Sequence, residues 1–517
     1  MWQFSLKIFL VVSFILISMS SCSPPKPIYS IDNIPFIPLP SSVTTSDKVL
    51  PLNEIQSIRI LGEDEQLISM AQNFKSFWKN HTQDELQISH GQMSQDNTIT
   101  LKIKEDFKSH PEAYKLEINS DKIGVFAKTA EGIFRGLKTL EQMVFLCKLE
   151  GKTNFLSLPG GIITDQPGYE YRGAMLDVAR HFFSVADVKR YIDLLSIYKI
   201  NFLHFHLSDD QGWRIEIKSW PKLTKIGGKT QVGGGEGGFY TQEDFKEIIK
   251  YAGDRFITIV PEIDLPGHTN AALASYSELN CNGEATALYT GIEVGFSTLC
   301  VDKEITYLFV EDVIREISEI SPGPFFHIGG DESHVTPQAD FNLFMDRTLS
   351  IVKKYNKTPM GWYELITADI SEETLLQYWA KTEDFSKVIP KKSKLLISAS
   401  SYSYLDMKYD SMTPLGLNWA GYLPVKKAYE WDPLTLVPDL DSEQIIGLEA
   451  PLWSETLENF DDIAFMAFPR ILGHAEIGWT DVNLRKWNDF SNRLSHHGPL
   501  LRALGVKYYP APEIDWK

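Results

Sequence analysis

From Tyr171 to Trp453, short apolar runs alternate with amphipathic helical stretches, and no other feature of the 517-residue sequence restricts the fold as strongly. Helical stretches such as VADVKRYIDLLSIYK and QEDFKEIIKYAGDR separate the early runs. Eight strand–helix units over about 350 residues predict a (β/α)8 barrel with insertions, which we assign to residues 166–517. The eight predicted strands are YRGAMLDVA, NFLHFHLS, FITIVPEID, FFHIGGDE, KTPMGWYE, TLLQYWA, KLLISAS and IIGLEAPLW.

The preceding residues, 23–165, have a different pattern. YKLEINSDKIGVFAK contains two alternating runs around a polar turn, which predicts a β-hairpin. AEGIFRGLKTLEQMVFLC then places Ile133, Leu137, Leu140 and Val144 at helical spacing. We therefore expect a smaller, non-catalytic α+β domain with an antiparallel sheet, separated from the barrel by the Pro-Gly turn in ITDQPGYEY.

The first 22 residues are typical of a bacterial secretory signal. Lys7 precedes the apolar run from Ile8 to Ile17, and the small residues SMSS lead to Cys22. The run is too short for a transmembrane span. The segment resembles the lipobox of lipoproteins, although Met19 stands where an aliphatic residue is usual. We expect an exported protein of the cell envelope that is lipidated on Cys22; the alternative is ordinary cleavage with an incidental cysteine.

Composition narrows the function further. With 68 acidic and 50 basic side chains the formal charge is −18, which disfavours a nucleic acid partner. A hydrophobic content of 43% excludes a disordered chain. Export would expose cysteines to an oxidising compartment, where a Cys281–Cys300 bridge would close a loop of about 20 residues and add about 3 kcal/mol of stability. Cys147 is interpreted as a buried free thiol.

Charged and polar residues gather at the ends of the predicted strands. In a barrel of this kind strand C-termini converge on one mouth, and carboxylates at four successive ends indicate a site because unpaired buried charges are costly. His204, His206 and His327 are more simply interpreted as satisfied core residues, and Arg172 as structural. The other strand-end residues are Asp177, Arg180, Asp209, Asp210, Glu262, Asp264, His268, Asp331, Glu332, Glu364, Tyr404, Asp406 and Glu455.

Two classes of hydrolase fit this mouth. One is a metal-dependent barrel hydrolase, because His204-x-His206 with downstream His and Asp could supply ligands. The other is a glycoside hydrolase, which needs carboxyl groups and aromatic platforms for sugar faces. Four tryptophans on or after the late strands, Trp362, Trp379, Trp419 and Trp453, favour the glycoside hydrolase. A carbohydrate-binding protein without turnover is the third alternative.

Four motifs in order then carry a family resemblance: LDVARHF, LHFHLSDDQGWRIEI, PEIDLPGH and HIGGDES. From about Tyr171 to Trp479 the sequence resembles family 20 glycoside hydrolases, the β-N-acetylhexosaminidases, and most closely their bacterial exo-acting members. The resemblance implies release of terminal β-linked GlcNAc or GalNAc with retention, through an oxazolinium ion formed by the 2-acetamido group of the substrate. It implies no metal and no cofactor, and it leaves the natural glycan and the oligomeric state open.

The resemblance also implies roles for individual residues. Glu332 would be the general acid and base, and Asp331 and Tyr404 would bind the acetamido group through its N–H and its oxygen. Asp209 and His268 would tune the proton affinity of Glu332. The implied substrate-binding residues are Arg180, Asp406 and Glu455 for the sugar hydroxyls, Trp362, Trp379 and Trp453 around the acetamido methyl and ring, and Trp419 toward the leaving group. Cys281 and Cys300 match a disulfide-bearing loop of the family.

Overall fold

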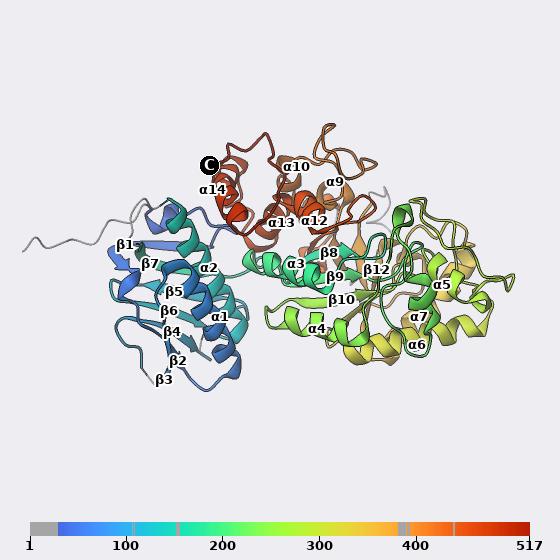
Figure 1. Ribbon diagram of the computed structural model, residues 1–517, viewed down its shortest axis with the longest axis horizontal. Helices are drawn as coiled ribbons and strands as arrows, with labels where there is room; N and C mark the ends of the chain where they lie inside the picture. The colour runs from blue at the N-terminus through green and yellow to red at the C-terminus, as the bar shows by residue number, and fades with distance from the viewer. Residues whose placement is uncertain are drawn as a thin grey trace, which may run out of the picture.

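The computed structural model describes residues 29–91, 93–105, 107, 109–150, 156–380, 389, 393–437 and 440–517. Figure 1 shows two parts, a sheet domain formed by the N-terminal residues in blue and a larger barrel domain formed by the rest. The predicted secretory segment and Cys22 lie outside the described residues. Among the helices of the described chain, none combines the length and hydropathy needed to cross a bilayer.

The N-terminal domain is built on one seven-stranded sheet with the order β1-β7-β5-β6-β4-β2-β3. The predicted hairpin is present, with β5 antiparallel to β6. The prediction was an antiparallel sheet, but the sheet is mixed. Strand β2 runs parallel to both β3 and β4, and β4 runs parallel to β6. The strands are β1 (Ser42–Pro51), β2 (Ser57–Leu61), β3 (Gln87–Gly91), β4 (Thr98–Ile103), β5 (Tyr114–Ile118), β6 (Lys122–Ala127) and β7 (Ser157–Asp165).

Helix α1 (Glu65–Thr82) explains the parallel pair, because it links β2 to β3 as a crossover. Asp64 caps this helix by accepting hydrogen bonds from the backbone N–H groups of Gln66 and Leu67. Helix α2 (Ala130–Glu150) packs beside it against the sheet, and its predicted apolar positions are all buried. Two 3-10 turns, η1 (Ile31–Asn33) and η2 (Leu52–Glu54), complete this domain.

The second domain is a closed barrel of eight parallel strands, and each of the eight predicted runs supplies one of them. The strands are β8 (Tyr171–Asp177), β9 (Phe202–His206), β10 (Thr258–Glu262), β11 (Phe325–His327), β12 (Thr358–Trp362), β13 (Leu375–Tyr378), β14 (Lys394–Ile397) and β15 (Ile445–Ala450). The predicted (β/α)8 fold is therefore confirmed.

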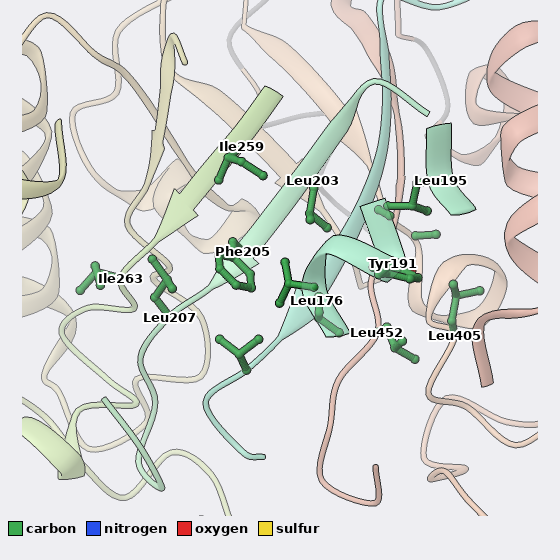
Figure 2. Close-up of a cluster of buried hydrophobic side chains, with 14 of the residues drawn as sticks. Leu176, Tyr191, Leu195, Leu203, Phe205, Leu207, Ile259, Ile263, Leu405 and Leu452 are labelled. Atoms are coloured by element: carbon green, nitrogen blue, oxygen red, sulfur yellow. The ribbon is translucent and has the colours of Figure 1, made fainter. Parts of the chain in front are cut away.

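Alternation along each strand separates two buried environments. Leu203 and Phe205 of β9 pack outward with Leu176 and against Tyr191 of helix α3 (Val185–Ile197), as Figure 2 shows. The intervening residues, among them His204, face the barrel interior together with Glu262 of β10. An apolar layer that includes Tyr171 fills one end of the interior. Polar side chains are thus held in the barrel beneath the mouth at its other end.

Helices of very different lengths surround the barrel. They are α3 (Val185–Ile197), α4 (Gln242–Gly253), α5 (Asn270–Ser275), α6 (Glu304–Ile320), α7 (Gln338–Lys354), α9 (Ser400–Ser403), α10 (Val425–Tyr429), α11 (Pro433–Leu436), α12 (Phe460–Ala467), α13 (Arg470–Trp479) and α14 (Trp487–Ala503). Short turns are η3 (Leu223–Gly227), which is π-helical, η4 (Val232–Gly234), η5 (Ser277–Leu279), η6 (Tyr363–Thr367) and η7 (Ser442–Gln444). The C-terminal helix α14 packs against α2 and so joins the two domains.

Buried ion pairs reinforce this junction. The Nζ of Lys199 lies 3.0 Å from Asp165 Oδ2 at the end of β7, and Trp479 donates its indole N–H to the same carboxylate at 2.9 Å. Arg172 is fully buried and pairs with Glu112 of the N-terminal domain. The interpretation of Arg172 as structural is therefore confirmed. These ion pairs hold the two domains together, because separating the pairs would leave buried charges without partners.

Candidate active site

The backbone after strand β11 leaves regular geometry just before Asp331 and Glu332. Gly329 and Gly330 have φ of +65° and +102°, and Glu332 has φ of +44°. A Cβ atom at Gly329 would lie 1.7 Å from a carboxylate oxygen of Asp264, so glycine is required there. Regular β alternation would send neighbouring side chains to opposite faces, and this turn instead brings both carboxyl groups to one cavity. A left-handed glutamate is costly and typical of functional sites.

A cavity of about 530 Å³ opens at the barrel mouth beside these two residues. Eight of the twelve residues predicted for catalysis or substrate binding line it. The full lining is Arg180, Ile292, Val294, Asp331, Glu332, Trp379, Ala380, Tyr404, Leu417, Trp419, Trp453 and Glu455. The remaining four predicted residues, Asp209, His268, Trp362 and Asp406, lie directly behind this wall.

His268 connects Glu332 to a buried carboxylate. Its Nδ1 lies 3.2 Å from Asp209 Oδ1, and its Nε2 lies 3.7 Å from Glu332 Oε2 and 3.9 Å from Asp331 Oδ2. Burial opposes a charge on His268, but the neighbouring carboxylates, Asp209 first, raise its pKa well above the ordinary value. The imidazole is thus a cation at neutral pH, placed against the two cavity carboxyl groups.

Asp209 is the counter-ion that holds this arrangement. Its carboxylate lies 2.9 Å from both Arg180 Nη2 and His206 Nε2, in addition to His268. Although burial would raise the pKa of Asp209, Arg180 and His268 hold it well below the ordinary range. Asp177 fixes Arg180 from the other side by accepting hydrogen bonds from the backbone N–H groups of Ala179 and Arg180. Sequence reasoning gave Asp177 no role.

The carboxyl group of Glu332 has the opposite tendency. Burial, followed by the charge of Asp331, raises its pKa, whereas His268 and Arg180 act to lower it. Asp331 is buried, and its Oδ1 accepts no hydrogen bond from the described residues. Two adjacent carboxyl groups are therefore in different environments, one able to retain a proton and the other presenting an unused acceptor.

Aromatic rings form most of the remaining wall. Tyr404 is buried, and its ring centroid lies 6.2 Å from Trp453, 6.4 Å from Trp379 and 5.8 Å from Trp419. Trp419 is 56% exposed, so it stands at the rim. The guanidinium of Arg180 lies over the ring of Trp453, 4.8 Å from its centroid. These rings and this cation surround one concave, partly apolar space that suits the faces of a sugar.

Trp362 and Asp406 lie deeper than the cavity surface. Trp362 is fully buried, donates its indole N–H to Glu262 Oε1 at 3.0 Å, and supports Trp453 from below at a centroid distance of 5.9 Å. Asp406 accepts the backbone N–H of Trp453 at 3.4 Å. Burial, and then the charge of Glu455, raises the pKa of Asp406 well above the ordinary value.

The barrel histidines converge on Glu262. His204, His206 and His327 each place a ring nitrogen within 3.0 Å of its carboxylate. His204, His327 and Glu262 are close enough together to hold a cation, as are three other sets of neighbouring histidines and carboxylates among the described residues. Glu262, however, already accepts hydrogen bonds from His206 and Trp362. The geometry is that of a hydrogen-bonded buried network, in agreement with the interpretation of these histidines as core residues.

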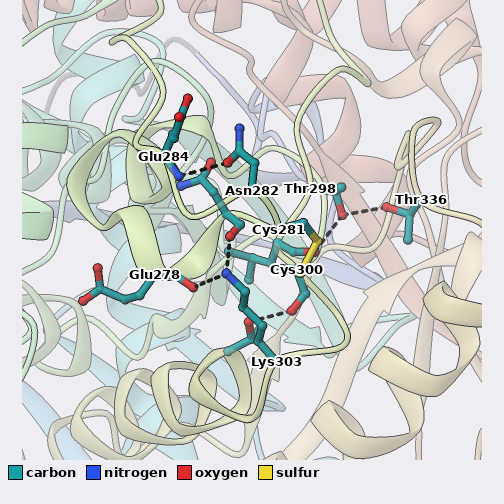
Figure 3. The surroundings of a disulfide bond; sticks show 11 residues. Glu278, Cys281, Asn282, Glu284, Thr298, Cys300, Lys303 and Thr336 are labelled. Atoms are coloured by element: carbon teal, nitrogen blue, oxygen red, sulfur yellow. Dashed lines mark hydrogen bonds between the residues drawn. A yellow bond between two sulfur atoms is a disulfide. The ribbon is translucent and has the colours of Figure 1, made fainter.

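A disulfide between Cys281 and Cys300 closes the loop that supplies Ile292 and Val294 to the cavity, as predicted for this pair. Figure 3 shows the bridge above Lys303, whose Nζ donates to the backbone carbonyl of Glu278. Ser297 ties the same loop to the barrel by donating to Asp210 Oδ1 at 2.5 Å. The bridge and this hydrogen bond hold one rim of the cavity. Cys147 is buried and outside any disulfide.

Two further carboxyl groups at the site, besides Asp177, have no role in the sequence prediction. Asp264 accepts the backbone N–H of Gly330 at 3.0 Å, and burial followed by the charge of Asp331 raises its pKa well above the ordinary value. Glu364, in η6, accepts the indole N–H of Trp379. Both were recognisable as strand-end acids, but their partners come from other strands, so sequence spacing alone gave no indication of what they contact.

A (β/α)8 barrel whose mouth holds paired carboxyl groups in a cavity walled by tryptophans defines a glycoside hydrolase. Comparison with known families agrees: the catalytic-domain model of glycosyl hydrolase family 20 matches residues 169–482, and the model for domain 2 of that family matches residues 33–166. The chain therefore belongs to glycosyl hydrolase family 20, and it is a glycoside hydrolase of the β-N-acetylhexosaminidase type.

Individual relatives support this assignment. The chain is 40% identical to a β-N-acetylhexosaminidase of Cellulomonas fimi over 423 residues, which cover 81% of this chain and 84% of the relative. Among solved structures, a family 20 β-N-acetylhexosaminidase from Streptomyces coelicolor A3(2) has a TM-score of 0.89 at 43% identity, covering 94% of this chain and 99% of its own. The Streptomyces plicatus N-acetyl-β-hexosaminidase in complex with Thio-NAglucal has a TM-score of 0.90 at 42% identity, covering 95% and 99%.

Proposed function

We propose that the protein is an exo-acting β-N-acetylhexosaminidase that removes terminal, non-reducing β-linked GlcNAc or GalNAc with retention of configuration. The observation that carries the proposal is the pair Asp331–Glu332, whose carboxyl groups share one cavity but differ in environment. A single terminal sugar suits a cavity that is closed below by Trp362 and walled by aromatic rings.

In the proposed reaction the substrate supplies its own nucleophile. The acetamido oxygen attacks the anomeric carbon and forms a C–O bond as the glycosidic bond breaks, while Glu332 gives its proton to the leaving oxygen. Asp331 accepts the acetamido N–H, a role that its unpaired Oδ1 supports. Tyr404 donates to the acetamido oxygen from the adjacent wall. Water then attacks the same carbon, Glu332 takes its proton, and the oxazolinium ring opens with retention.

The remaining polar groups position the sugar. Arg180, already neutralised by Asp209, is placed to bind ring hydroxyls, with Asp406 and Glu455 beside it. His268 places its positive charge against Glu332, which limits how far burial raises the pKa of that acid. This balance would keep Glu332 protonated before the leaving group departs and able to release its proton in the first step.

Export to the cell envelope and lipidation of Cys22 are also part of the proposal. The disulfide between Cys281 and Cys300 supports it, because such bridges persist in oxidising compartments. Incorporation of radiolabelled palmitate into the wild-type chain, and its loss in Cys22→Ala, would test the anchor. A labelled Cys22→Ala chain would show that the acyl group is attached elsewhere.

The decisive experiment compares wild-type enzyme with Glu332→Gln on chromogenic β-GlcNAc and β-GalNAc substrates and on a panel of glycans. We expect the variant to lose turnover by about 10² to 10⁴-fold while still binding sugar, since general acid–base catalysis contributes about that much. Equal behaviour of the two proteins would instead indicate a carbohydrate-binding protein. A thiazoline analogue of the oxazolinium should inhibit tightly; weak inhibition together with a fully active Asp331→Asn would exclude substrate assistance.

A further inference from the structure

The indole of Trp379 is held by a carboxyl group that lies behind the cavity wall. Its N–H points at both oxygens of Glu364, at 3.2 Å and 3.1 Å. Trp379 follows strand β13, whereas Glu364 belongs to η6 after strand β12, so the contact joins two neighbouring strand ends. Partly buried indole N–H groups usually have such a partner, because a buried donor without an acceptor is destabilising.

The rings around Trp379 are arranged so that its orientation matters. Its plane is within 19° of that of Tyr404, and Trp419 meets it edge-on at a centroid distance of 6.1 Å. Tyr363, the neighbour of Glu364, packs on the indole at 6.0 Å. A rotation of the indole would therefore change the width of the cavity between Trp379 and Tyr404.

Glu364 itself faces a second cavity, of about 370 Å³, which also touches Glu332. Burial, followed by the charge of Asp331, raises the pKa of Glu364 to about 8, so the carboxyl group is largely protonated at neutral pH. Among the described residues, the titratable groups that face it are Asp331, Glu332, Tyr363, Tyr404 and His334. A protonated Glu364 can accept the indole N–H without adding another negative charge beside the catalytic pair.

We propose that Glu364 is a positioning residue that fixes the Trp379 indole as the wall facing the 2-acyl group of the substrate, and thereby sets the length of N-acyl group that the enzyme accepts. The inference rests on the proposed function for the nature of the substrate. The contact between Glu364 and Trp379 does not, and it can be measured without any substrate.

The kinetic test uses aryl β-glucosaminides carrying N-acetyl, N-propanoyl and N-butanoyl groups. We expect Glu364→Leu to lower kcat/KM for the acetyl substrate at least tenfold, with a threefold or larger loss of discrimination against the longer acyl groups. Glu364→Gln keeps an acceptor and should recover most of that loss. Glu373→Gln, an exposed residue on the segment between the same strands, is the matched control and should behave as wild type.

A double variant shows whether the effect passes through the indole. Trp379→Phe removes the N–H, so Glu364→Leu should cost little more in that background. If the two losses multiply, or if Glu364→Leu lowers activity equally for every acyl length, Glu364 does not act through Trp379 and the inference fails. Contacting residues show coupling in such cycles, whereas independent sites add.

The second test needs no activity. The twelve tryptophans can be replaced by 5-fluorotryptophan, with the Trp379 resonance identified by its absence in Trp379→Phe. Between pH 6 and pH 10 this resonance should shift with a midpoint near 8 in the wild type and should stay constant in Glu364→Gln. In Glu332→Gln it should still shift, with a midpoint no higher than in the wild type, because the charge of Glu332 contributes to raising the pKa of Glu364. A shift that survives Glu364→Gln would overturn the contact. A correct fluorine result with no hydrolysis of any acyl substrate would instead refute the proposed function.

Discussion

Replacing His268 by glutamine should move the alkaline limb of the pH dependence of kcat/KM to higher pH. The His268 imidazole is held as a cation by Asp209 and lies 3.7 Å from Glu332. A neighbouring positive charge favours the ionised form of a carboxyl group and lowers its pKa. Without that charge Glu332 should keep its proton to higher pH, and activity that requires protonated Glu332 should extend upward.

The size of the shift follows from the distance. Two unit charges 3.7 Å apart interact by about 4.5 kcal/mol at an effective dielectric constant of about 20. Since about 1.4 kcal/mol corresponds to one pKa unit, the ceiling is about three units. The Glu332 side chain is 31% exposed, and water screens part of the interaction. We therefore expect the alkaline limb to move by roughly one to two pH units.

The assay is kcat/KM on a chromogenic β-GlcNAc substrate from pH 5 to pH 10, for wild type and His268→Gln. His90→Gln, an exposed histidine of β3 in the other domain, is the control for a change of histidine content alone. The reasoning is refuted if the alkaline limb of His268→Gln stays in place or moves to lower pH. Either result would mean that Glu332 is not the titrating acid or that His268 is not its cationic neighbour.

Further predictions follow from the same geometry. Asp331→Asn should lower kcat/KM about 10² to 10³-fold and move the alkaline limb to lower pH, because the Asp331 charge raises the pKa of Glu332; pH–rate profiles measure both. Replacing Cys281 and Cys300 by serine should lower the free energy of unfolding by about 3 kcal/mol in the chain-entropy model. The variant should therefore have a lower Tm than the wild type under non-reducing conditions, and the two proteins should have the same Tm once a reducing agent is added. Trp419→Ala should raise KM about tenfold with little effect on kcat, since an exposed ring contributes binding more than catalysis. Activity should survive excess chelator, and its loss would favour a metal-dependent mechanism.

The strands of the barrel were predictable because of how parallel sheets are buried. Helices cover their outer face and side chains fill the interior, so each strand is a nearly continuous apolar run between polar turns. All eight runs carry this composition, and each became a strand. The N-terminal sheet was harder, because β3, with the sequence QISHG, has neither an apolar run nor clear alternation. Its parallel pairing depends on the crossover through α1, which a hairpin pattern does not indicate.

In the candidate site, too, some features were predictable from the sequence and others were not. Asp331 and Glu332 were recognisable because two glycines precede them in one short motif, and the backbone explains why those glycines are there. The contacts of Glu262 were not recognisable, since they depend on the register that sets this residue opposite both His206 of β9 and His327 of β11. Local patterns thus predicted which residues gather at the barrel mouth, while cross-strand register decided which of them touch.

Register also explains how the site can be strongly acidic and still be stable. An oxocarbenium-like or oxazolinium species carries positive charge, and carboxylates around it would stabilise it, but several anions in one buried space would repel each other. Here Asp209 is neutralised by Arg180 and His268, whereas burial raises the pKa of Glu332 and Glu364 toward their neutral forms. An arrangement that keeps most of the other acids paired or protonated leaves Asp331, whose Oδ1 accepts no hydrogen bond from the described residues, as the carboxyl group that would face the acetamido nitrogen. This selectivity supports assigning the charge-stabilising role to Asp331 and the proton-transferring role to its neighbour.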